Sequence, residues 1–405
     1  MSRRIHYFNP GHETAVLLGT PNYTPPRNVR IMTKDLSFLP AWYARPGDLV
    51  LLDNPLPDNF RQEFPDGLFP QVIPAVNQAS VHALPTDEPI IATPWGISPQ
   101  SLHKIGQFKK ETGLRIHVQK WDPLLKELTG RQTAARSLDR LKQLLPHDNL
   151  PATPRFFSDI ESLEQTLTQM AEEAPFLLKA PYSSSGRGLL WLADKRLTPK
   201  EREWAQGAIA KQGAISLEKG LNKILDLAFE YEADGKGHCR FEGFSIFGTE
   251  ERGNYSGNRL ETQEKLRACL LNYLSETELE QTQEALGSVL ADLFATYEGN
   301  IGVDMLIHKT KEQTYRLHPC VEINTRQTMG RVALELFRKL VSPSATGDFR
   351  ISFGKEPGQA LAHKREMTAR HPLELDGQGK IRKGYLSLCP VDEETHYWAE
   401  IWIQE

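Results

Sequence analysis

Short apolar runs alternate with an amphipathic stretch along the first 120 residues. The runs at residues 5–8, 49–52, 89–92 and 115–118 are each bounded by turn-forming residues, which is the pattern of buried strands. The stretch from Ser98 to Thr112 lies between the last two runs and predicts a helix. Strands that alternate with helices predict an α/β layer built on a mostly parallel sheet.

The pattern changes after residue 130. Leucines at helical spacing (Leu138, Leu141, Leu144 and Leu145) predict a helix over residues 130–145, and the proline-flanked segment 146–154 predicts a linker. The further strands expected from the pattern cover residues 176–180, 189–192, 214–219, 224–233, 239–247, 301–307 and 315–323, with two more in 383–404. Together these elements predict a mixed α/β and α+β chain.

Capping signals mark the expected helices of this second part. Ser158 with Glu161, Thr198 with Pro199 and Glu201, and Ser275 with Glu278 each predict the first turn of a helix. Gly299 is expected to end the helix that Ser275 opens, in a left-handed conformation. A last helix is expected over residues 331–340.

Length and composition describe an ordinary soluble protein. With 405 residues the chain is too long for a single hydrophobic core. We expect four domains or subdomains, at residues 1–125, 126–215, 216–345 and 346–405. The net charge of −4 gives no reason to expect nucleic-acid or membrane-surface binding. The basic start Met1-Ser2-Arg3-Arg4 lacks an apolar signal core, so a cytoplasmic location is expected. Four scattered cysteines predict free thiols and no zinc site.

A serine- and glycine-rich loop follows the apolar run at residues 176–180. Ser183, Ser184, Ser185 and Gly186 are small enough for their backbone amides to approach an anion. Lys179 ends the incoming strand, and Arg187 lies in the loop, so both could balance phosphate charge. Because the loop joins two strands, it is not a P-loop. The alternative is an ordinary hairpin with a surface lysine.

A second set of polar residues lies on the paired strands at 301–307 and 315–323. Glu322 and Asn324 are two residues apart, so their side chains share one face of a strand, and Asp304 lies on the neighbouring strand. Three oxygen ligands of this kind suit Mg²⁺ bound with phosphates. Arg326 would continue the same face and bind a carboxylate or phosphoryl group. The alternative is an exposed ion pair between Glu322 and Arg326.

The two segments KAPYSSSGRG and GVDMLI…VEINTR resemble the ATP-grasp superfamily of carboxylate–amine ligases. The resemblance implies an ATP-grasp fold preceded by a Rossmann-like domain, with ATP and two Mg²⁺ ions as cofactors. It implies that Lys179 and the loop 183–188 form a lid over the triphosphate, and that Asp304, Glu322 and Asn324 hold the metal. It also implies that Arg326 contacts substrate or phosphate.

The same resemblance implies the nucleotide contacts. Glu218 and Lys219 match the hinge strand that meets adenine, and Asp226 matches the residue that binds ribose. The lysine that usually contacts the α-phosphate is replaced here by Arg131, with Arg136 as the competing candidate.

Substrate-site candidates come from the rule that ligands bind beyond the carboxyl ends of parallel strands. Asn9 and His12 follow the first strand, and Trp95 follows the third. The alternatives are that Asn9 and His12 cap the next helix and that Trp95 belongs to the core.

These residues predict an ATP-dependent ligase that converts a carboxylate into an acylphosphate and joins it to an amine or related nucleophile. The negative charge on the phosphoryl group during its transfer would be stabilised by Lys179, Arg187 and Arg326. The expected partners are a small-molecule or peptide carboxylate and an amine, with no nucleic acid and no membrane; a homo-oligomer is left open. The alternatives are a small-molecule kinase on the same fold and a nucleotide-binding regulatory module without turnover.

Overall fold

The computed structural model describes residues 2–85, 88–145, 150–183, 186, 188–249 and 255–404. The chain forms two compact units. The first contains residues 1–125, 256–265 and 326–405, and the second contains residues 126–255 and 266–325. The division into four parts expected from the sequence stays a prediction. Three elements cross the sequence boundaries between the units: α5 (Leu124–Thr129), β12 (Tyr255–Leu260) and α9 (Gln263–Leu270).

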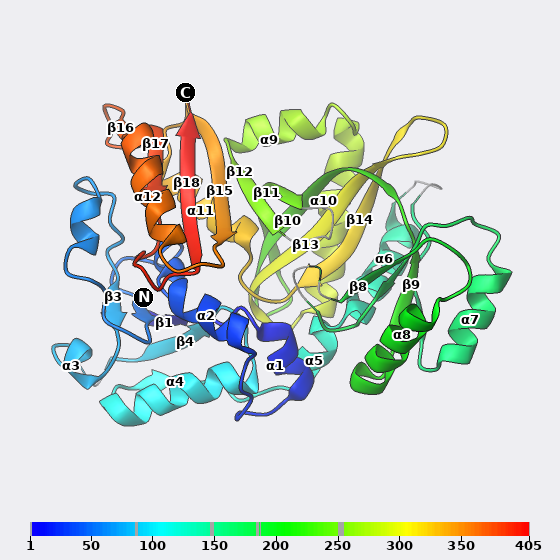
Figure 1. The fold of residues 1–405 in the computed structure, drawn as a ribbon, viewed down its shortest axis with the longest axis horizontal. Coiled ribbons are helices and arrows are strands. Elements are labelled where there is room, and N and C mark those ends of the chain that lie inside the picture. Colours follow the sequence, from blue (N-terminus) through cyan, green and yellow to red (C-terminus); the bar gives the residue numbers. More distant parts are fainter. Residues whose placement is uncertain are drawn as a thin grey trace. The chain divides into compact units, whose positions relative to one another are not determined.

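A five-stranded parallel sheet organises the N-terminal part of the first unit, in the order β3-β2-β1-β4-β5. Figure 1 labels three of its strands, β1, β3 and β4. Its strands are β1 (Arg3–Tyr7), β2 (Leu49–Leu51), β3 (Ile73–Ala75), β4 (Ile90–Pro94) and β5 (Ile116–His117). Alternate residues enter different cores: Leu49 packs in the cluster that contains Ile5, and Val50 in the cluster that contains Phe8. Burial of both faces explains the unbroken apolar runs. The predicted parallel sheet is confirmed.

Helices connect these strands. They are α1 (His12–Leu18), α2 (Arg27–Asp35), α3 (Gln78–Val81) and α4 (Pro99–Thr112), with 3-10 turns η1 (Leu39–Trp42) and η2 (Phe60–Glu63). Ser98 caps α4, because its side chain accepts a hydrogen bond from the amide of Ser101. The helix predicted from Ser98 to Thr112 is therefore confirmed.

The C-terminal part of the first unit contains five antiparallel strands of a nine-stranded sheet, in the order β12-β15-β18-β17-β16. The new elements are β15 (Thr346–Phe353), β16 (Glu374–Leu375), β17 (Ile381–Ser387), β18 (Tyr397–Gln404), α11 (Met329–Leu340) and α12 (Gln359–Arg370). Val332, Leu336 and Leu340 recur at helical spacing on α11 and enter the same core as Phe8. The C-terminal strand pair predicted within 383–404 is confirmed.

The second unit contains a small antiparallel sheet in the order β6-β9-β7-β8. Its elements are β6 (Arg155–Phe157), β7 (Phe176–Lys179), β8 (Leu189–Leu192) and β9 (Ile215–Lys219), with α7 (Ile160–Gln169) and α8 (Pro199–Gln212). Leu163 and Leu167 of α7 and Ala205 of α8 pack against Phe176 and Leu178 of β7. This packing fixes β7, whose last residue is Lys179.

Four strands of a nine-stranded sheet complete the second unit, in the order β14-β13-β10-β11. These strands are β10 (Asn222–Asp234), β11 (Cys239–Thr249), β13 (Glu298–Lys309) and β14 (Tyr315–Asn324), accompanied by α6 (Arg131–Leu144) and α10 (Glu276–Leu293). Asp304 of β13 lies directly opposite Glu322 of β14, next to a register shift between Asp304 and Leu306. The regular ladder is therefore interrupted directly beside the residue pair that carries the two carboxylates.

Two predicted helix ends are wrong. The N-cap of α7 is Asp159, which accepts a hydrogen bond from the amide of Ser162 at 2.8 Å, and not Ser158. Helix α10 ends at Leu293, before Gly299. Gly299 instead lies in β13 with φ +142°, because β13 pairs with β10 as far as Glu298. Long-range ladder hydrogen bonds therefore override the local stop signal.

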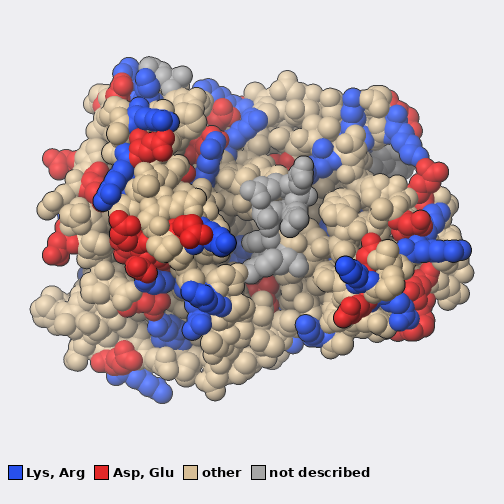
Figure 2. All heavy atoms as spheres, in the orientation of Figure 1, with Lys and Arg blue, Asp and Glu red and all other residues tan. Residues whose placement is uncertain are grey.

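The molecular surface mixes charges of both signs. On the face that Figure 2 draws, Lys and Arg side chains are interspersed with Asp and Glu side chains among uncharged residues. In the part of the chain that the structure describes, no helix combines the length and the apolar character that a bilayer crossing requires.

Candidate active site

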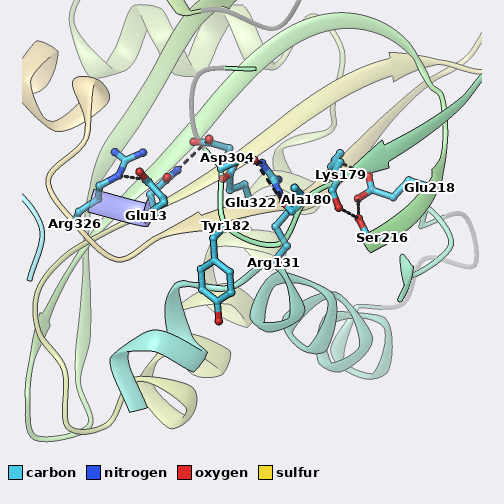
Figure 3. A network of polar contacts seen from close by, with 12 residues as sticks. Glu13, Arg131, Lys179, Ala180, Tyr182, Ser216, Glu218, Asp304, Glu322 and Arg326 are labelled. Carbon is cyan, nitrogen blue, oxygen red and sulfur yellow. Dashed lines mark hydrogen bonds and ion pairs between the residues drawn. The ribbon is translucent and has the colours of Figure 1, made fainter. Parts of the chain in front are cut away.

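Strands β13 and β14 bring three oxygen-bearing side chains together. Asp304 and Glu322 are direct cross-strand partners, and Asn324 Nδ2 donates to Asp304 Oδ2 at 3.0 Å. This hydrogen bond occupies the amide NH₂ of Asn324 and orients its carbonyl oxygen away from that contact. The three predicted metal ligands therefore lie in one cluster, of which Figure 3 labels Asp304 and Glu322.

Arg131 joins this cluster to the end of β7. Its Nη2 lies 3.1 Å from Glu322 Oε2, and only 9% of its side chain is exposed. Its Nε donates to the carbonyl of Ala180 at 3.2 Å, and Nη2 also lies 3.4 Å from Ser183 Oγ. Arg136, by contrast, pairs with Glu127 at 2.6 Å and is about half exposed. Of the two competing arginines, the geometry favours Arg131.

Lys179 forms a second buried ion pair. Its Nζ lies 2.5 Å from Glu218 Oε2, with exposed fractions of 5% and 15% for the two side chains. The pairing follows from the sheet, because β7 and β9 are antiparallel and place Lys179 opposite Ser216, two residues before Glu218. Figure 3 shows Lys179 at the end of β7 beside Glu218 and Ser216 of β9.

The loop after Lys179 is a connection between antiparallel strands, as predicted. Ser184, Ser185 and Arg187 lie outside the described residues. Gly186 has φ +71°, a conformation that favours glycine. A Cβ on Gly188 would lie 2.3 Å from the Cβ of Ser183, so the loop closes where only glycine fits. The amide of Ala180 donates to the Gly188 carbonyl at 2.9 Å and closes the base of the loop.

The remaining predicted nucleotide contacts have partners of their own. Asp226 Oδ2 lies 2.6 Å from Lys223 Nζ and accepts a hydrogen bond from Thr249 Oγ1 at 2.6 Å. Lys219 Nζ lies 5.1 Å from the centroid of the Phe176 ring. Burial, together with the nearby charge of Lys311, lowers the pKa of Lys219.

The predicted substrate residues meet in the first unit, at the ends of β1 and β4. Asn9 Nδ2 donates to the Gly96 carbonyl at 2.9 Å, and Asn9 Oδ1 accepts from the Gly96 amide at 3.1 Å. Asn9 thus clamps the β4 end and does not cap α1, whose N-cap is Gly11. Trp95 is 2% exposed and packs edge-on against Phe8 at 5.0 Å, which favours the core alternative for its ring.

Arg326 also belongs to this region, and its direction differs from the prediction. Strand β14 ends at Asn324, so strand alternation does not set the side chain of Arg326. Instead, Arg326 forms an isolated antiparallel bridge with Gly96, and the Gln327 amide donates to the Trp95 carbonyl at 2.7 Å. The backbone of this segment is thereby fixed to the end of β4.

Glu13 belongs to the segment 9–13 after the first strand, which the sequence marks as a substrate-site candidate together with Asn9 and His12. Its Oε1 accepts a hydrogen bond from Arg326 Nε at 2.6 Å, and 7% of its side chain is exposed. Burial opposes ionisation of Glu13, but Arg326 and His12 outweigh it and lower the pKa of this carboxyl. The sequence signal for Glu13 is its place shortly after the first strand, and in the structure it lies in the first turn of α1. The exposed Glu322–Arg326 pair is thus replaced by two pairs, Glu322 with Arg131 and Glu13 with Arg326.

Comparisons with known proteins place this geometry in a known fold. A scan against models of protein families found no match, and a search of curated proteins found none. N5-carboxyaminoimidazole synthetase from Staphylococcus aureus, complexed with ADP, matches with a TM-score of 0.50 at 10% identity, over 100% of this chain and 94% of that one. This enzyme is an ATP-grasp enzyme, and the likeness spans the whole chain. The chain has the ATP-grasp fold.

Two further solved structures have TM-scores just below that value. Biotin carboxylase from Campylobacter jejuni has a TM-score of 0.49 at 10% identity, covering 99% of this chain and 87% of that one. Carboxyaminoimidazole ribonucleotide synthase from Aspergillus clavatus, complexed with ATP, has a TM-score of 0.49 at 12% identity, covering 100% and 94%. The fold assignment rests on the synthetase from Staphylococcus aureus.

Within this ATP-grasp fold, the cluster of β13 and β14 fits Mg²⁺ by its donor chemistry. Asp304, Glu322 and Asn324 offer carboxylate and amide oxygens, the donors that a hard cation prefers. Among the described residues, no three His, Cys, Asp or Glu side chains gather in a metal-binding group. A metal here would therefore depend on the Asn324 amide oxygen and on oxygens from outside the protein.

His318 lies buried in the second unit of the ATP-grasp fold. Burial, aided by the charges of Lys179 and His308, lowers the pKa of His318 to about 3. Its Nδ1 accepts from the Cys320 amide at 3.4 Å. The imidazole is therefore neutral at physiological pH.

Proposed function

We propose that this protein is an ATP-dependent ligase of the ATP-grasp type. A carboxylate oxygen of the substrate attacks the γ-phosphorus of ATP, the bond to the β-phosphate oxygen breaks, and ADP leaves. An amine or related nucleophile then attacks the acyl carbon of the acylphosphate. The C–O bond to phosphate breaks, phosphate leaves, and the amine proton passes to solvent.

One observation supports this proposal above the others. Two buried cations, Arg131 and Lys179, stand beside the oxygen cluster of Asp304, Glu322 and Asn324 in one unit. Phosphoryl transfer requires positioning and charge stabilisation more than a protein nucleophile, and this arrangement supplies both signs of charge at fixed positions.

Each group has a role in the proposal. Lys179 and Arg131 would bind phosphate oxygens as they release Glu218 and Glu322. Bound Mg²⁺, held by the oxygen cluster, would neutralise charge on the phosphates. Arg326, fixed by Glu13, would orient the substrate carboxylate through its guanidinium.

The test measures products across a panel of carboxylic acids, bicarbonate included, with ATP, Mg²⁺ and hydroxylamine. Hydroxylamine converts an acylphosphate into a hydroxamate with release of phosphate, whereas a kinase leaves a stable phosphorylated alcohol. We expect ADP, phosphate and hydroxamate in equal amounts. A phosphorylated product with no free phosphate would support the kinase instead, and ATP binding without turnover would support the regulatory module.

Variants connect the products to the site. Asn324→Ala and Glu322→Gln should abolish Mg²⁺-dependent ADP formation, because both remove a metal oxygen or its charge. Glu312→Gln, in the exposed turn between β13 and β14, is the matched control and should retain full turnover. Normal turnover in Asn324→Ala would refute the metal assignment.

A further inference from the structure

The guanidinium of Arg131 is held in place from two sides. Its Nε donates to the Ala180 carbonyl at 3.2 Å, and its Nη2 lies 3.1 Å from Glu322 Oε2. Both nitrogens belong to one planar group, so these two contacts together set its position. The backbone of Arg131 is also fixed, because its amide donates to the Pro181 carbonyl at 3.2 Å at the first residue of α6. The positive charge therefore stays beside Glu322.

The carboxylate that Arg131 contacts is also one of the predicted metal ligands. Asp304 lies directly opposite Glu322 on the neighbouring strand, and like charges on directly paired residues repel one another. Arg131 places a positive charge next to this pair, with only 9% of its own side chain exposed. The Glu322 side chain is 25% exposed, so an ion from solvent can reach it. A divalent cation requires the same carboxylates as ligands, and therefore competes with Arg131 for them.

The two cations repel one another at this separation. A metal bound to Glu322 Oε2 at about 2 Å would lie no more than about 5 Å from Arg131 Nη2. Charges of like sign repel strongly over this distance in a partly buried site. A guanidinium does not lose its proton in proteins, so deprotonation cannot relieve the repulsion. A phosphate group can relieve it, because its oxygens accept hydrogen bonds from the guanidinium and balance its charge.

We propose that Arg131 makes metal binding at Glu322 conditional on the nucleotide. While Arg131 pairs with Glu322, the oxygen cluster of Asp304, Glu322 and Asn324 takes up free Mg²⁺ only weakly. A nucleotide phosphate that binds the guanidinium releases Glu322 and removes the repulsion, so the metal binds together with the nucleotide. The inference rests on the proposed function and adds the dependence of one ligand on the other. The coupling is reciprocal, so bound metal raises the affinity for the nucleotide by the same factor.

A substitution distinguishes this inference from the simpler view that Arg131 only binds phosphate. Loss of a phosphate-binding group predicts weaker nucleotide binding and an unchanged affinity of the nucleotide-free protein for metal. Loss of a competing cation predicts that the metal affinity rises. Arg131→Gln removes the charge and keeps a polar side chain. The same substitution should therefore weaken nucleotide binding and strengthen metal binding.

The test titrates the full-length, nucleotide-free protein with Mn²⁺, which accepts the same oxygen donors as Mg²⁺. Electron paramagnetic resonance measures the free Mn²⁺ at each step. We expect Arg131→Gln to bind Mn²⁺ at least tenfold more tightly than the wild type. Adding Glu322→Gln to Arg131→Gln should abolish this gain and thereby place the ion at Glu322. Arg136→Gln removes the same charge from the same helix, where Arg136 pairs with Glu127 at 2.6 Å, and should bind Mn²⁺ as the wild type does.

The outcomes separate the inference from the ligase reaction. Equal Mn²⁺ affinities of the wild type and a folded Arg131→Gln overturn the inference. A wild type that binds Mn²⁺ as tightly without nucleotide as with ADP also overturns it, and this comparison depends on no variant. A gain of affinity in Arg131→Gln without ADP formation from any carboxylate retains the inference and refutes the ligase. Formation of ADP, phosphate and hydroxamate, together with equal Mn²⁺ affinities of the two proteins, retains the ligase and refutes the inference.

Discussion

His318 should make the second unit sensitive to mild acid. Its pKa is about 3 in the folded protein, against 6.5 for an unperturbed histidine. Between these values the unfolded chain binds a proton that the folded chain does not bind. Stability therefore falls as the pH falls below 6.5, which is the opposite of a histidine whose pKa is raised by a partner.

The magnitude follows from the two pKa values. A difference of about 3.5 units sets a ceiling of about 5 kcal/mol on the free energy of unfolding. At pH 5 the unfolded histidine is almost fully protonated, while the folded one is neutral. The loss relative to pH 8 is then about 2 kcal/mol.

The assay measures the free energy of urea-induced unfolding at several pH values between 8 and 5. Hydrogen exchange of the amides of β13 and β14 is the readout for the second unit. His318→Gln removes the titrating group, so its stability should depend less on pH than that of the wild type by about 2 kcal/mol over this range. Any pH-independent change in stability that the substitution causes cancels, because only the slopes of unfolding free energy against pH are compared. Equal slopes for the two proteins would refute the burial argument.

His363 in the first unit is the control of opposite sign. Its Nε2 lies 2.8 Å from Glu400 Oε2, and this hydrogen bond outweighs burial and raises the pKa of His363. Its stabilisation is fully present below the unfolded pKa of 6.5 and is lost as the pH rises through the folded value. His363→Gln should therefore cost more stability at pH 5 than at pH 8, measured on the amides of β18.

Three further predictions concern the nucleotide site and its loop. Arg131→Ala should weaken Mg²⁺-ATP binding at least tenfold in calorimetry. Arg136 is half exposed, so Arg136→Ala should leave the affinity unchanged. Equal losses of affinity in the two variants would contradict the choice of Arg131. Lys179→Met should also weaken ATP binding at least tenfold while the protein stays folded by circular dichroism, and normal affinity would remove Lys179 from the phosphate site. Gly188→Ala should destabilise the protein by about 1–3 kcal/mol, because the added Cβ would clash with Ser183. Gly207 lies in a helix with open space around it, so Gly207→Ala should stabilise the protein by about 0.5–1 kcal/mol. Thermal unfolding of both variants tests these two opposite changes in stability.

Local pattern determined much of this protein in advance. Apolar spacing and turn residues predict four of the five strands of the parallel sheet, the helix from Pro99 to Thr112 and the connection after Lys179, because these features depend on neighbours in the sequence. The remaining strand, β3, was not predicted. The alternation of side chains along one strand placed Glu322 and Asn324 in the same cluster. The resemblance to the ATP-grasp superfamily rested on these segments alone.

Tertiary structure decided the partners. Glu13 and Arg326 are 313 residues apart, and Arg131 meets Glu322 from a different element, so no local period could pair them. The same holds for Gly299, whose stop signal yields to the ladder between β13 and β10, and for the helix start at Asp159, where two adjacent capping residues compete. Sequence spacing fixes which residues share a face of one element. Which faces then meet is set by the burial of apolar surface and by backbone pairing across the whole chain, and these decide where each charge finds its counterpart.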